Sequence, residues 1–557
     1  MRLKFLPLVA VAFAAMLPSR AEAQAQLTLG DVQTILSQSV SRALEVSPQA
    51  IIAIVDNNGI VLAVWSVSGA PPNVNLILSV GAAVREAGTA AFLSSDQSAL
   101  SSRTAQFIIQ QNFPAGVKNQ GPGPLVGVAF SNLFLSTDLS HVFRSDVNRF
   151  KGKDAVTPFN GSTPTGLGFG VPNTRLSGRS SSAALYKNGT MVGGIGVYPI
   201  PYPTVAQEVA DAFAIELHNA VAGQNNEEAV AVAGAIGFQP LPSITANNIL
   251  INGFRFPYVL ATPQITTLIP FAALPGNAVV IPSLVGLPVF DYTPMAAPPQ
   301  PVLPTENFNG QVGQYYYPIR PDPNPGLING VPRLTAAEVH NIVTNGAIRA
   351  STTRAAIRFP VGVPMQCWVT VVGNPNVAGQ PPPVLAAFRT TNAPMFSFDV
   401  AVQKGRTALF FSSSTVAQSS RTVGFLAQDY YPPGLNANPP SIYGPEQTLN
   451  GIPSFNGLQL QFSFPAPTGY APNGNLPNGI TVFPGGFPLY RMRSDGVPIL
   501  VGAVGISGDG VDQDDIVGIS ATVGYQAPLN IRADNFILGG ARLPYAKIPR
   551  NPDISGN

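Results

Sequence analysis

The chain has 557 residues, of which 45% are hydrophobic and only 10% are charged, and its formal net charge is +2. This weak charge, with no basic stripe, excludes the electrostatic attraction to phosphate on which nucleic-acid binding depends. The 56 prolines and 54 glycines predict long loops, because both residues interrupt helices and strands.

Residues 1–23 predict a secretory signal peptide, so we expect a periplasmic or secreted protein. Arg2 and Lys4 precede an apolar run, and a small-x-small cleavage sequence ends at Ala23. The most apolar later stretch, residues 259–290, contains five prolines. A spanning helix needs about 20 apolar residues in a row, so we expect no membrane span in the mature chain.

The sequence contains two related halves. Residues 79–107 align without a gap on residues 397–425, and 14 of the 29 positions are identical. A repeat of this length excludes a short-period solenoid and predicts two homologous domains, at residues 24–263 and 334–557, joined by a Pro-rich connector at 264–333. Similar segments follow the same order elsewhere, and they pair residues 27–32 with 334–339, 191–197 with 500–506, and 248–258 with 535–545.

Each half predicts the same elements in the same order: a helix, a hairpin, a helix, a hairpin and a closing helix. Thr28 with Asp31, and Thr335 with Glu338, predict a capped start of the opening helix. Asn188-Gly189 predicts a tight hairpin turn, because both residues tolerate positive φ. The predicted elements occupy residues 28–40, 50–67, 79–92, 183–197 and 205–222 in the first half, and residues 335–347, 366–388, 397–410, 489–506 and 512–525 in the second.

This order of elements predicts a mixed α/β fold of the α+β type, in which an antiparallel sheet is flanked by helices in each half. Residues 132–180 and 434–485 are rich in Gly, Pro, Asn and Ser, so we expect long insertions there. Insertions of this kind serve as binding surfaces or as packing arms.

A family resemblance lies in the second half. Residues 501–508 read Val-Gly-Ala-Val-Gly-Ile-Ser-Gly, the acidic stretch 512–515 follows, and residues 404–408 read Lys-Gly-Arg-Thr-Ala. These segments resemble the Val-Gly-Ala-Ile-Gly-Val-Ser-Gly strand, the acidic Gln-Asp helix start and the Lys-Ala-x-Thr-Ala helix of the GlcG/HbpS-type haem-binding family. The first half keeps the strand at 192–197 but has Tyr-Pro-Ile-Pro at 198–201 in place of the acidic stretch.

The resemblance implies two tandem profilin-like domains that bind haem, or a similar small molecule, as ligand. Members of the family often form oligomers, so a homo-oligomer is also expected. The resulting hypothesis is an exported haem-binding protein of the GlcG/HbpS type.

Four residues are candidates for contacts with haem. An iron donor has to face an apolar slot, and His340 on the opening helix of the second half, His218 on the predicted closing helix of the first half, and Lys404 are such donors. Arg421, in a repeated Ser-Ser-Arg-Thr sequence, would pair with a haem propionate. Each residue also has a structural interpretation, as a surface or hydrogen-bonded histidine or as a cation that joins two parts of a domain.

Two other functions stay open from the sequence alone. A structural or interaction protein would have kept the fold and lost the ligand, and a haem-degrading enzyme would require a reductant. The chain has no Gly-x-Ser-x-Gly, no His-Glu-x-x-His and only one cysteine, Cys367, so the sequence predicts no catalytic residue and no metal site. The acidic run 509–515 lacks the order of a calcium loop, and stabilisation of a helix N-terminus explains it better.

Overall fold

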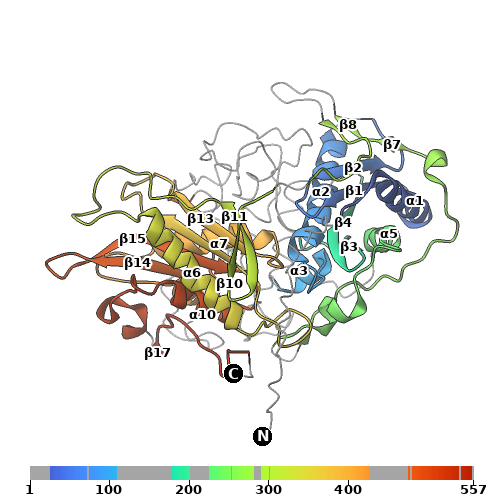
Figure 1. Cartoon of the computed structure of the whole chain (residues 1–557). Helices are drawn as coiled ribbons and strands as arrows, with labels where there is room; N and C mark the ends of the chain where they lie inside the picture. Colours follow the sequence, from blue (N-terminus) through green and yellow to red (C-terminus); the bar gives the residue numbers. More distant parts are fainter. Residues whose placement is uncertain are drawn as a thin grey trace, which may run out of the picture.

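The computed structural model describes two parts of the chain, each built around a sheet that carries helices on its faces (Figure 1). The predicted signal peptide, residues 1–23, lies outside the described residues, as do most of both long insertions. The described residues are 25–71, 74–108, 177–200, 225–251, 254–281, 290–299, 302–426, 475–476, 480–538 and 541–554.

The first half contains a five-stranded antiparallel sheet. Its strands are β1 (Ala50–Asp56), β2 (Val61–Ser66), β3 (Ser182–Lys187), β4 (Thr190–Pro199) and β7 (Asn277–Ala278). They are adjacent in the order β3-β4-β1-β2-β7. The predicted turn between β1 and β2 is held by Asp56, whose Oδ1 accepts hydrogen bonds from the backbone N–H groups of Asn58 and Ile60 at 2.9 and 2.7 Å.

The second half contains a six-stranded antiparallel sheet. Its strands are β10 (Thr305–Phe308), β11 (Gln311–Tyr317), β12 (Trp368–Gly373), β13 (Val384–Thr390), β14 (Gly486–Met492) and β15 (Pro498–Ser507). They are adjacent in the order β10-β11-β13-β12-β15-β14. Both halves are therefore of the predicted α+β type, with antiparallel sheets flanked by helices.

The strand orders of the two sheets correspond. The series β3-β4-β1-β2 in the first sheet has the same order along the chain as β14-β15-β12-β13 in the second. The segment predicted as a connector, residues 264–333, adds strands to both sheets, because β7 pairs with β2 and β11 pairs with β13. It is thus built into both halves rather than only linking them.

Helices cover both faces of the first sheet. They are α1 (Leu29–Val46), α2 (Val74–Leu93), α3 (Ser102–Ile108) and α5 (Asn226–Gly234). Ile52 and Ile54 of β1 belong to the cluster with α1 and α5, and Ile51 and Val55 belong to the cluster with α2. Successive side chains of a strand point to opposite faces, so this alternation buries both faces of β1.

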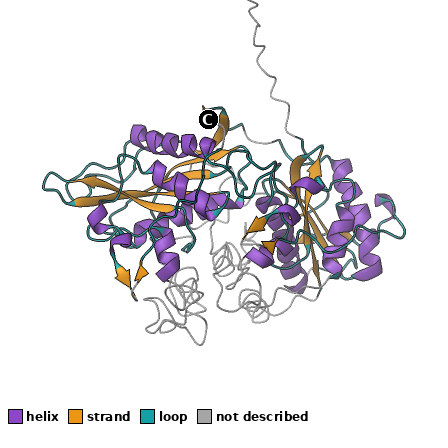
Figure 2. Ribbon diagram, turned by 90° about the horizontal axis from the view of Figure 1, so that it is seen from below, coloured by secondary structure: helices purple, strands orange, loops and turns teal. Residues whose placement is uncertain are grey.

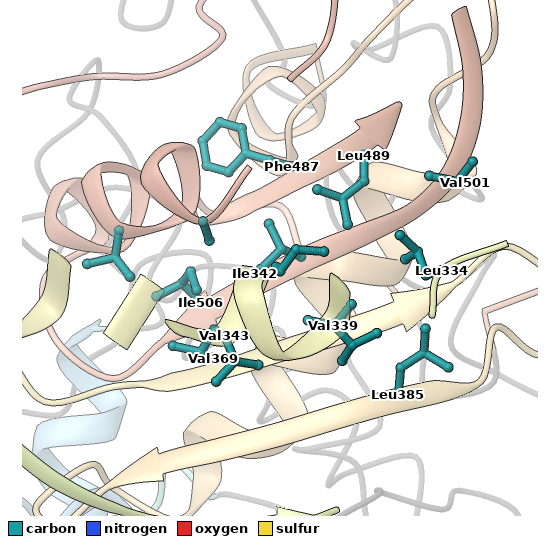
Figure 3. Packing of buried hydrophobic residues seen from close by; sticks show 14 of the residues in the cluster. Leu334, Val339, Ile342, Val343, Val369, Leu385, Phe487, Leu489, Val501 and Ile506 are labelled. Atoms are coloured by element: carbon teal, nitrogen blue, oxygen red, sulfur yellow. The ribbon is translucent and has the colours of Figure 1, made fainter. Parts of the chain in front are cut away.

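The second sheet is covered in the same way. Its helices are α6 (Ala336–Thr352), α7 (Phe396–Phe410), α8 (Ser420–Leu426) and α10 (Val511–Ala521). Val339 and Ile342 of α6 pack on Val369 of β12 and Ile506 of β15 (Figure 3). The other face carries α7, where Phe398 contacts Trp368 with ring centroids 4.9 Å apart.

Both opening helices begin with the predicted capping box. Thr28 and Asp31 exchange hydrogen bonds between side chain and backbone at the start of α1, and Thr335 and Glu338 do the same for α6. These caps satisfy N–H groups that have no partner inside the helix.

A short tail module follows each core. In the first half it consists of the 3₁₀ turns Pro242–Ile244 and Ala246–Asn248 with β5 (Leu250–Ile251) and β6 (Phe254–Arg255), and in the second half of Leu529–Ile531 and Ala533–Asn535 with β16 (Ile537–Leu538) and β17 (Ala541–Arg542). The connector adds the 3₁₀ turn Phe271–Ala273, β8 (Val280–Ile281) and β9 (Phe290–Asp291).

The repeated Ser-Ser-Arg-Thr sequence binds the tail module in both halves. Thr104 Oγ1 donates a hydrogen bond to the carbonyl of Pro257 at 2.9 Å. Thr422 Oγ1 donates to the carbonyl of Pro544 at 2.7 Å. The identical residues therefore make the same contact in each half, a hydrogen bond that joins the tail to the core.

The helix α5 follows the segment predicted as the closing helix of the first half. Residues 205–222 lie outside the described residues. Within the described part of the chain, α5 corresponds to α10, because Glu228 of α5 pairs with Arg103 as Asp515 of α10 pairs with Arg421.

The halves also differ at an aligned pair of phenylalanines. Phe92 is buried in a cluster that includes residues of both halves, whereas Phe410 packs beside Phe411 against a smaller cluster in the second half. The correspondence between halves therefore holds for the sheet and tail contacts but not at every aligned position.

The two halves contact each other through the segment that follows α6. Arg358 Nη1 donates a hydrogen bond to Ser98 Oγ at 2.9 Å, and Phe359 N donates to the carbonyl of Gln97 at 3.0 Å. Figure 2 shows the two parts side by side. Among the helices that are described, none combines the length and the apolar character that crossing a membrane would require.

Candidate functional site

A pocket with a volume of about 320 Å³ lies between the two halves. This volume is at the lower end of the ~300–1,000 Å³ that is typical of small-ligand sites. The first half contributes an apolar wall, made of Leu93, Leu100, Ile108, Ile249, Leu250 and Phe256. The second half contributes further apolar side chains and all of the charged groups that line the pocket.

The charged groups come from three places in the second half. Arg358 follows α6, Lys404 lies on α7, and Asp509, Asp512 and Asp514 lie at the end of β15 and the start of α10. The pocket therefore has an apolar side from the first half and a polar end from the second.

Lys404 is held inside the wall of this pocket. Its side chain is 1% exposed, and its Nζ lies 2.7 Å from Asp514 Oδ2 and 2.7 Å from the carbonyl of Ile506. Nζ also lies 5.2 Å from the centre of the Phe483 ring, a distance at which a cation is attracted by the ring face.

Burial shifts the pKa values of both members of this ion pair. Burial lowers the pKa of Lys404, and the carboxylate of Asp514 opposes that change. Burial raises the pKa of Asp514 to about 6, and the ammonium of Lys404 opposes it. Each charge therefore opposes the shift that burial causes in the pKa of the other group.

Arg421 lies on α8 and reaches the same end of α10. Its Nε is 2.5 Å from Asp515 Oδ2, and its Nη2 is 2.6 Å from Asp512 Oδ1. Burial alone would lower the pKa of Arg421, but the carboxylates of Asp515 and Asp512 raise it overall. Arg421 therefore acts here as a structural cation, and its pocket contact runs through Asp512.

The acidic run at the start of α10 is engaged by internal partners. Asp512 also pairs with Lys547 at 2.7 Å, and Asp509 Oδ1 accepts backbone hydrogen bonds from Ala356 and Ile357 at 2.6 and 3.0 Å. No group of three or more His, Cys, Asp or Glu side chains in the described ranges is arranged to hold a metal ion. Residues 509–515 therefore form ion pairs and stabilise the start of α10.

Two predicted haem contacts lie elsewhere. His340 lies on α6 with its side chain 42% exposed, and its Nε2 is 3.0 Å from Glu306 Oε1 of β10. It is not part of the pocket wall. His218 lies outside the described residues. The structure thus brings Lys404 and Arg421 to one end of α10 and leaves His340 away from it.

Arg358 is a site residue that the sequence interpretation missed. It is 2% exposed, and besides Ser98 it donates to the carbonyl of Gly508 at the pocket wall. Burial lowers the pKa of Arg358, and the charges of Asp509 and Asp514 oppose that change. The stretch between α6 and β12 is longer than the stretch between α1 and β1 of the first half, and this difference is a signal in the sequence for a special role.

The first half has a different group at the position of Lys404. The offset of 318 residues places Glu86 of α2 there. Glu86 is fully buried, and burial raises its pKa to about 7. The charges of Arg85 and Arg179 and the hydroxyls of Ser177 and Ser102 oppose this rise. The two halves therefore differ at this aligned position, which holds a cation in an ion pair in one half and a buried acid in the other.

The described wall of the pocket offers apolar side chains that a tetrapyrrole would contact, but it supplies no free iron donor. It contains no His, Tyr, Met or Cys, and the amine of Lys404 is engaged with Asp514 and Ile506. Cys367 is buried outside this wall, and burial raises the pKa of its thiol well above the usual value. Axial ligation by a residue of the described wall would therefore need the Lys404–Asp514 pair to break.

Comparison with known proteins gives the same region a family resemblance. Residues 376–522 match the family model described as haem degrading protein HbpS-like. A comparison with curated proteins finds no match.

Two solved structures are similar to part of the chain. The crystal structure of Klebsiella pneumoniae protein ORFY, of family-model DUF336, shares 13% identity over 38% of this chain and 91% of its own, with a TM-score of 0.20. The crystal structure of a PduOC:heme complex shares 17% identity over 36% of this chain and 96% of its own, with a TM-score of 0.16.

Proposed function

We propose that this chain is an exported binding protein that takes a haem-type tetrapyrrole, or a comparable small ligand, into the pocket between its halves. The observation that carries the proposal is the composition of this pocket. Most of its polar end, including Lys404, Ser507 and Asp514, lies within the residues that match the HbpS-like family model, whereas Arg358 precedes them. Its apolar side comes from the first half, which lies outside that match.

Burial of apolar surface drives binding in this proposal. Leu93, Leu100 and Phe256 give one face against which a flat apolar molecule packs, and Phe396 and Phe483 lie on the other half of the wall. Each square ångström of apolar surface removed from water contributes about 25 cal/mol. Because the described wall has no free iron donor, the affinity does not depend on the iron.

The proposal also includes an origin by tandem duplication and a location outside the cytoplasm. The duplication is supported by the tail contacts of Thr104 and Thr422 and by the matching strand orders of the two sheets. Export is supported by the signal-like sequence of residues 1–23.

An absorption and fluorescence titration tests the binding proposal. Haemin and metal-free protoporphyrin IX are added separately to the full chain, and both should bind with dissociation constants that differ by less than about threefold. Leu100→Trp fills the pocket and should weaken both by at least about tenfold. Leu241→Trp is the matched control, since Leu241 is 58% exposed and is not part of the wall.

Two results would overturn the proposal. One is the absence of binding by either tetrapyrrole to the folded chain. The other is binding that Leu100→Trp leaves unchanged, because the ligand would then occupy some other place.

A second candidate function, a structural or interaction protein without a ligand, is favoured by one observation. Arg421 and Lys404, the two cations that the sequence predicts to contact a ligand, are both engaged in buried internal ion pairs. In that case the titrations would show no saturable binding, while Leu100→Trp would change only stability.

A further inference from the structure

The polar end of the pocket includes buried side-chain atoms that lack a hydrogen-bond partner within the described structure. In the described part of the chain, four buried atoms of the wall have no hydrogen-bond partner: Asp514 Oδ1, Asp509 Oδ2, Ser397 Oγ and Arg358 Nε. Asp514 and Arg358 are 2% exposed, and Ser397 is fully buried. Buried polar atoms almost always have a hydrogen-bond partner. A ligand that donates to, or accepts from, these unpaired atoms therefore gains binding free energy.

The other atoms of these groups are fixed by the protein. Asp514 Oδ2 accepts from Lys404, and Asp509 Oδ1 accepts from the backbone of Ala356 and Ile357. Each carboxylate therefore has one oxygen held in place and the other one left over. These acceptors are preorganised, because little side-chain freedom is lost when a donor arrives.

The side chain of Arg358 supplies a hydrogen-bond donor near these carboxylates. The Nη atoms of Arg358 are bonded to Ser98, Ile357 and Gly508, which leaves Nε–H without a partner. The charges of Asp509 and Asp514 act on Arg358, so the donor and the acceptors belong to one neighbourhood. A matching ligand group would present a donor and an acceptor next to each other.

We propose that this end of the pocket binds a lactam group, whose N–H donates to a free carboxylate oxygen and whose carbonyl accepts from Arg358 Nε. Open-chain tetrapyrroles carry such lactams at their ends. Haem does not, because its four nitrogens ligate iron and the polar groups at its edge are only carboxylates. The inference rests on the proposed function and makes it narrower: the preferred ligand is an open-chain tetrapyrrole, not haem.

Charge in the wall supports this preference. Three carboxylates, those of Asp509, Asp512 and Asp514, face two cations, Arg358 and Lys404. Propionates of either ligand are repelled from this end and have to point elsewhere. The lactam is then the feature that distinguishes the two ligands at this place.

A paired titration of the full chain with biliverdin and haemin tests the inference. Biliverdin should bind at least about tenfold more tightly, as expected when charge-assisted hydrogen bonds replace unpaired buried atoms. Asp509→Asn turns the free acceptor into an N–H donor while its other oxygen keeps the backbone contacts. We expect this variant to lose about tenfold in biliverdin affinity and to leave haemin affinity unchanged.

Two further variants keep the test decisive. Ser397→Ala removes a second unpaired polar atom without adding bulk, and should reduce the preference for biliverdin in the same direction. Asp495→Asn is the control, because Asp495 is exposed and does not line the pocket. Urea midpoints show whether each variant is folded.

The outcomes are distinguishable. Haemin binding in the pocket as tightly as biliverdin, or a preference that Asp509→Asn and Ser397→Ala both leave intact, would overturn the inference and leave the proposed function standing. Failure of both tetrapyrroles to bind the folded chain would overturn the proposed function together with this inference.

Discussion

Arg103 Nε lies 2.6 Å from Glu228 Oε1, and both side chains are excluded from solvent. Arg103 belongs to the repeated Ser-Ser-Arg-Thr sequence, and Glu228 lies on helix α5 of the same half. Glu228 also accepts a backbone hydrogen bond from Leu260, so the pair joins the core, the closing helix and the tail. In the second half Asp515 accepts from Lys547 in the same way.

Breaking this pair should be costly in either half. We expect Arg103→Met to leave Glu228 buried and uncompensated, and to lower the free energy of unfolding by about 3–5 kcal/mol. Urea unfolding monitored by circular dichroism measures the change. Arg493→Met is the control, because Arg493 pairs with Asp495 on the surface, and it should leave the urea midpoint unchanged. Equal effects of both substitutions would contradict the role given to Arg103.

Glu86 should make stability depend on pH. Its pKa is raised from 4.5 to about 7 by burial, so the folded state holds the proton through a window in which the unfolded state has lost it. The folded state therefore loses stability as pH rises from about 4.5 to about 7, by roughly 3 kcal/mol in total. Glu86→Gln should be more stable than the parent at pH 8 and nearly equal to it at pH 4.

The opposite sign is expected for Glu338, whose pKa is lowered to about 2 by hydrogen bonds from Thr335, Tyr525 and Arg491 that outweigh burial. Its contribution to stability is lost as pH falls through that low value, so Glu338→Gln should cost stability at neutral pH. Urea midpoints at pH 4 and pH 8 test the sign for Glu86→Gln, and midpoints from about pH 5 down to about pH 2 test it for Glu338→Gln. A Glu86→Gln variant with the same pH dependence as the parent would show that Glu86 is not the titrating group.

Arg358 should couple the two halves. It contributes a buried hydrogen bond across the interface to Ser98, and Arg358→Met would leave that contact and the carbonyl of Gly508 without their donor. We expect a loss of about 2–4 kcal/mol and the appearance of two separate unfolding transitions in differential scanning calorimetry. A single transition at an unchanged temperature would contradict this coupling.

Gly505 should be intolerant of a side chain. A Cβ at this position of β15 would lie 1.8 Å from the backbone oxygen of Ala401 on α7, so the helix and the strand can approach this closely only with glycine. Gly505→Ala should destabilise the second half by more than about 3 kcal/mol, whereas Gly30→Ala, with 3.8 Å of clearance in α1, should be neutral or stabilising. Thermal unfolding of both variants distinguishes the outcomes.

Local chemistry in the sequence predicted much of the fold. The capping boxes at Thr28 and Thr335 and the Asn188-Gly189 turn are present, because each depends on residues only a few positions apart. The structural interpretation of Arg421, a cation that joins two parts of its domain, also agrees with its ion pairs to Asp512 and Asp515.

Long-range contacts were beyond the reach of sequence patterns. The prolines of residues 264–333 predict a connector without strands. Its strands β7 and β11 form because they pair with β2 and β13, which lie far from them in the sequence. The nine-residue helix α5 has too few turns to show a clear apolar period, so the sequence does not predict it. Arg358 was missed because a lone arginine in a loop gives no local signal of burial between two halves.

The central claim is that both halves together enclose one ligand site. Isothermal titration calorimetry of the full chain with the tetrapyrrole that binds most tightly tests it directly. The account predicts one ligand per chain, and loss of binding both in Leu100→Trp, from the first half, and in Ser397→Trp, from the second. Two ligands per chain, or binding that only the second-half variant abolishes, would contradict it.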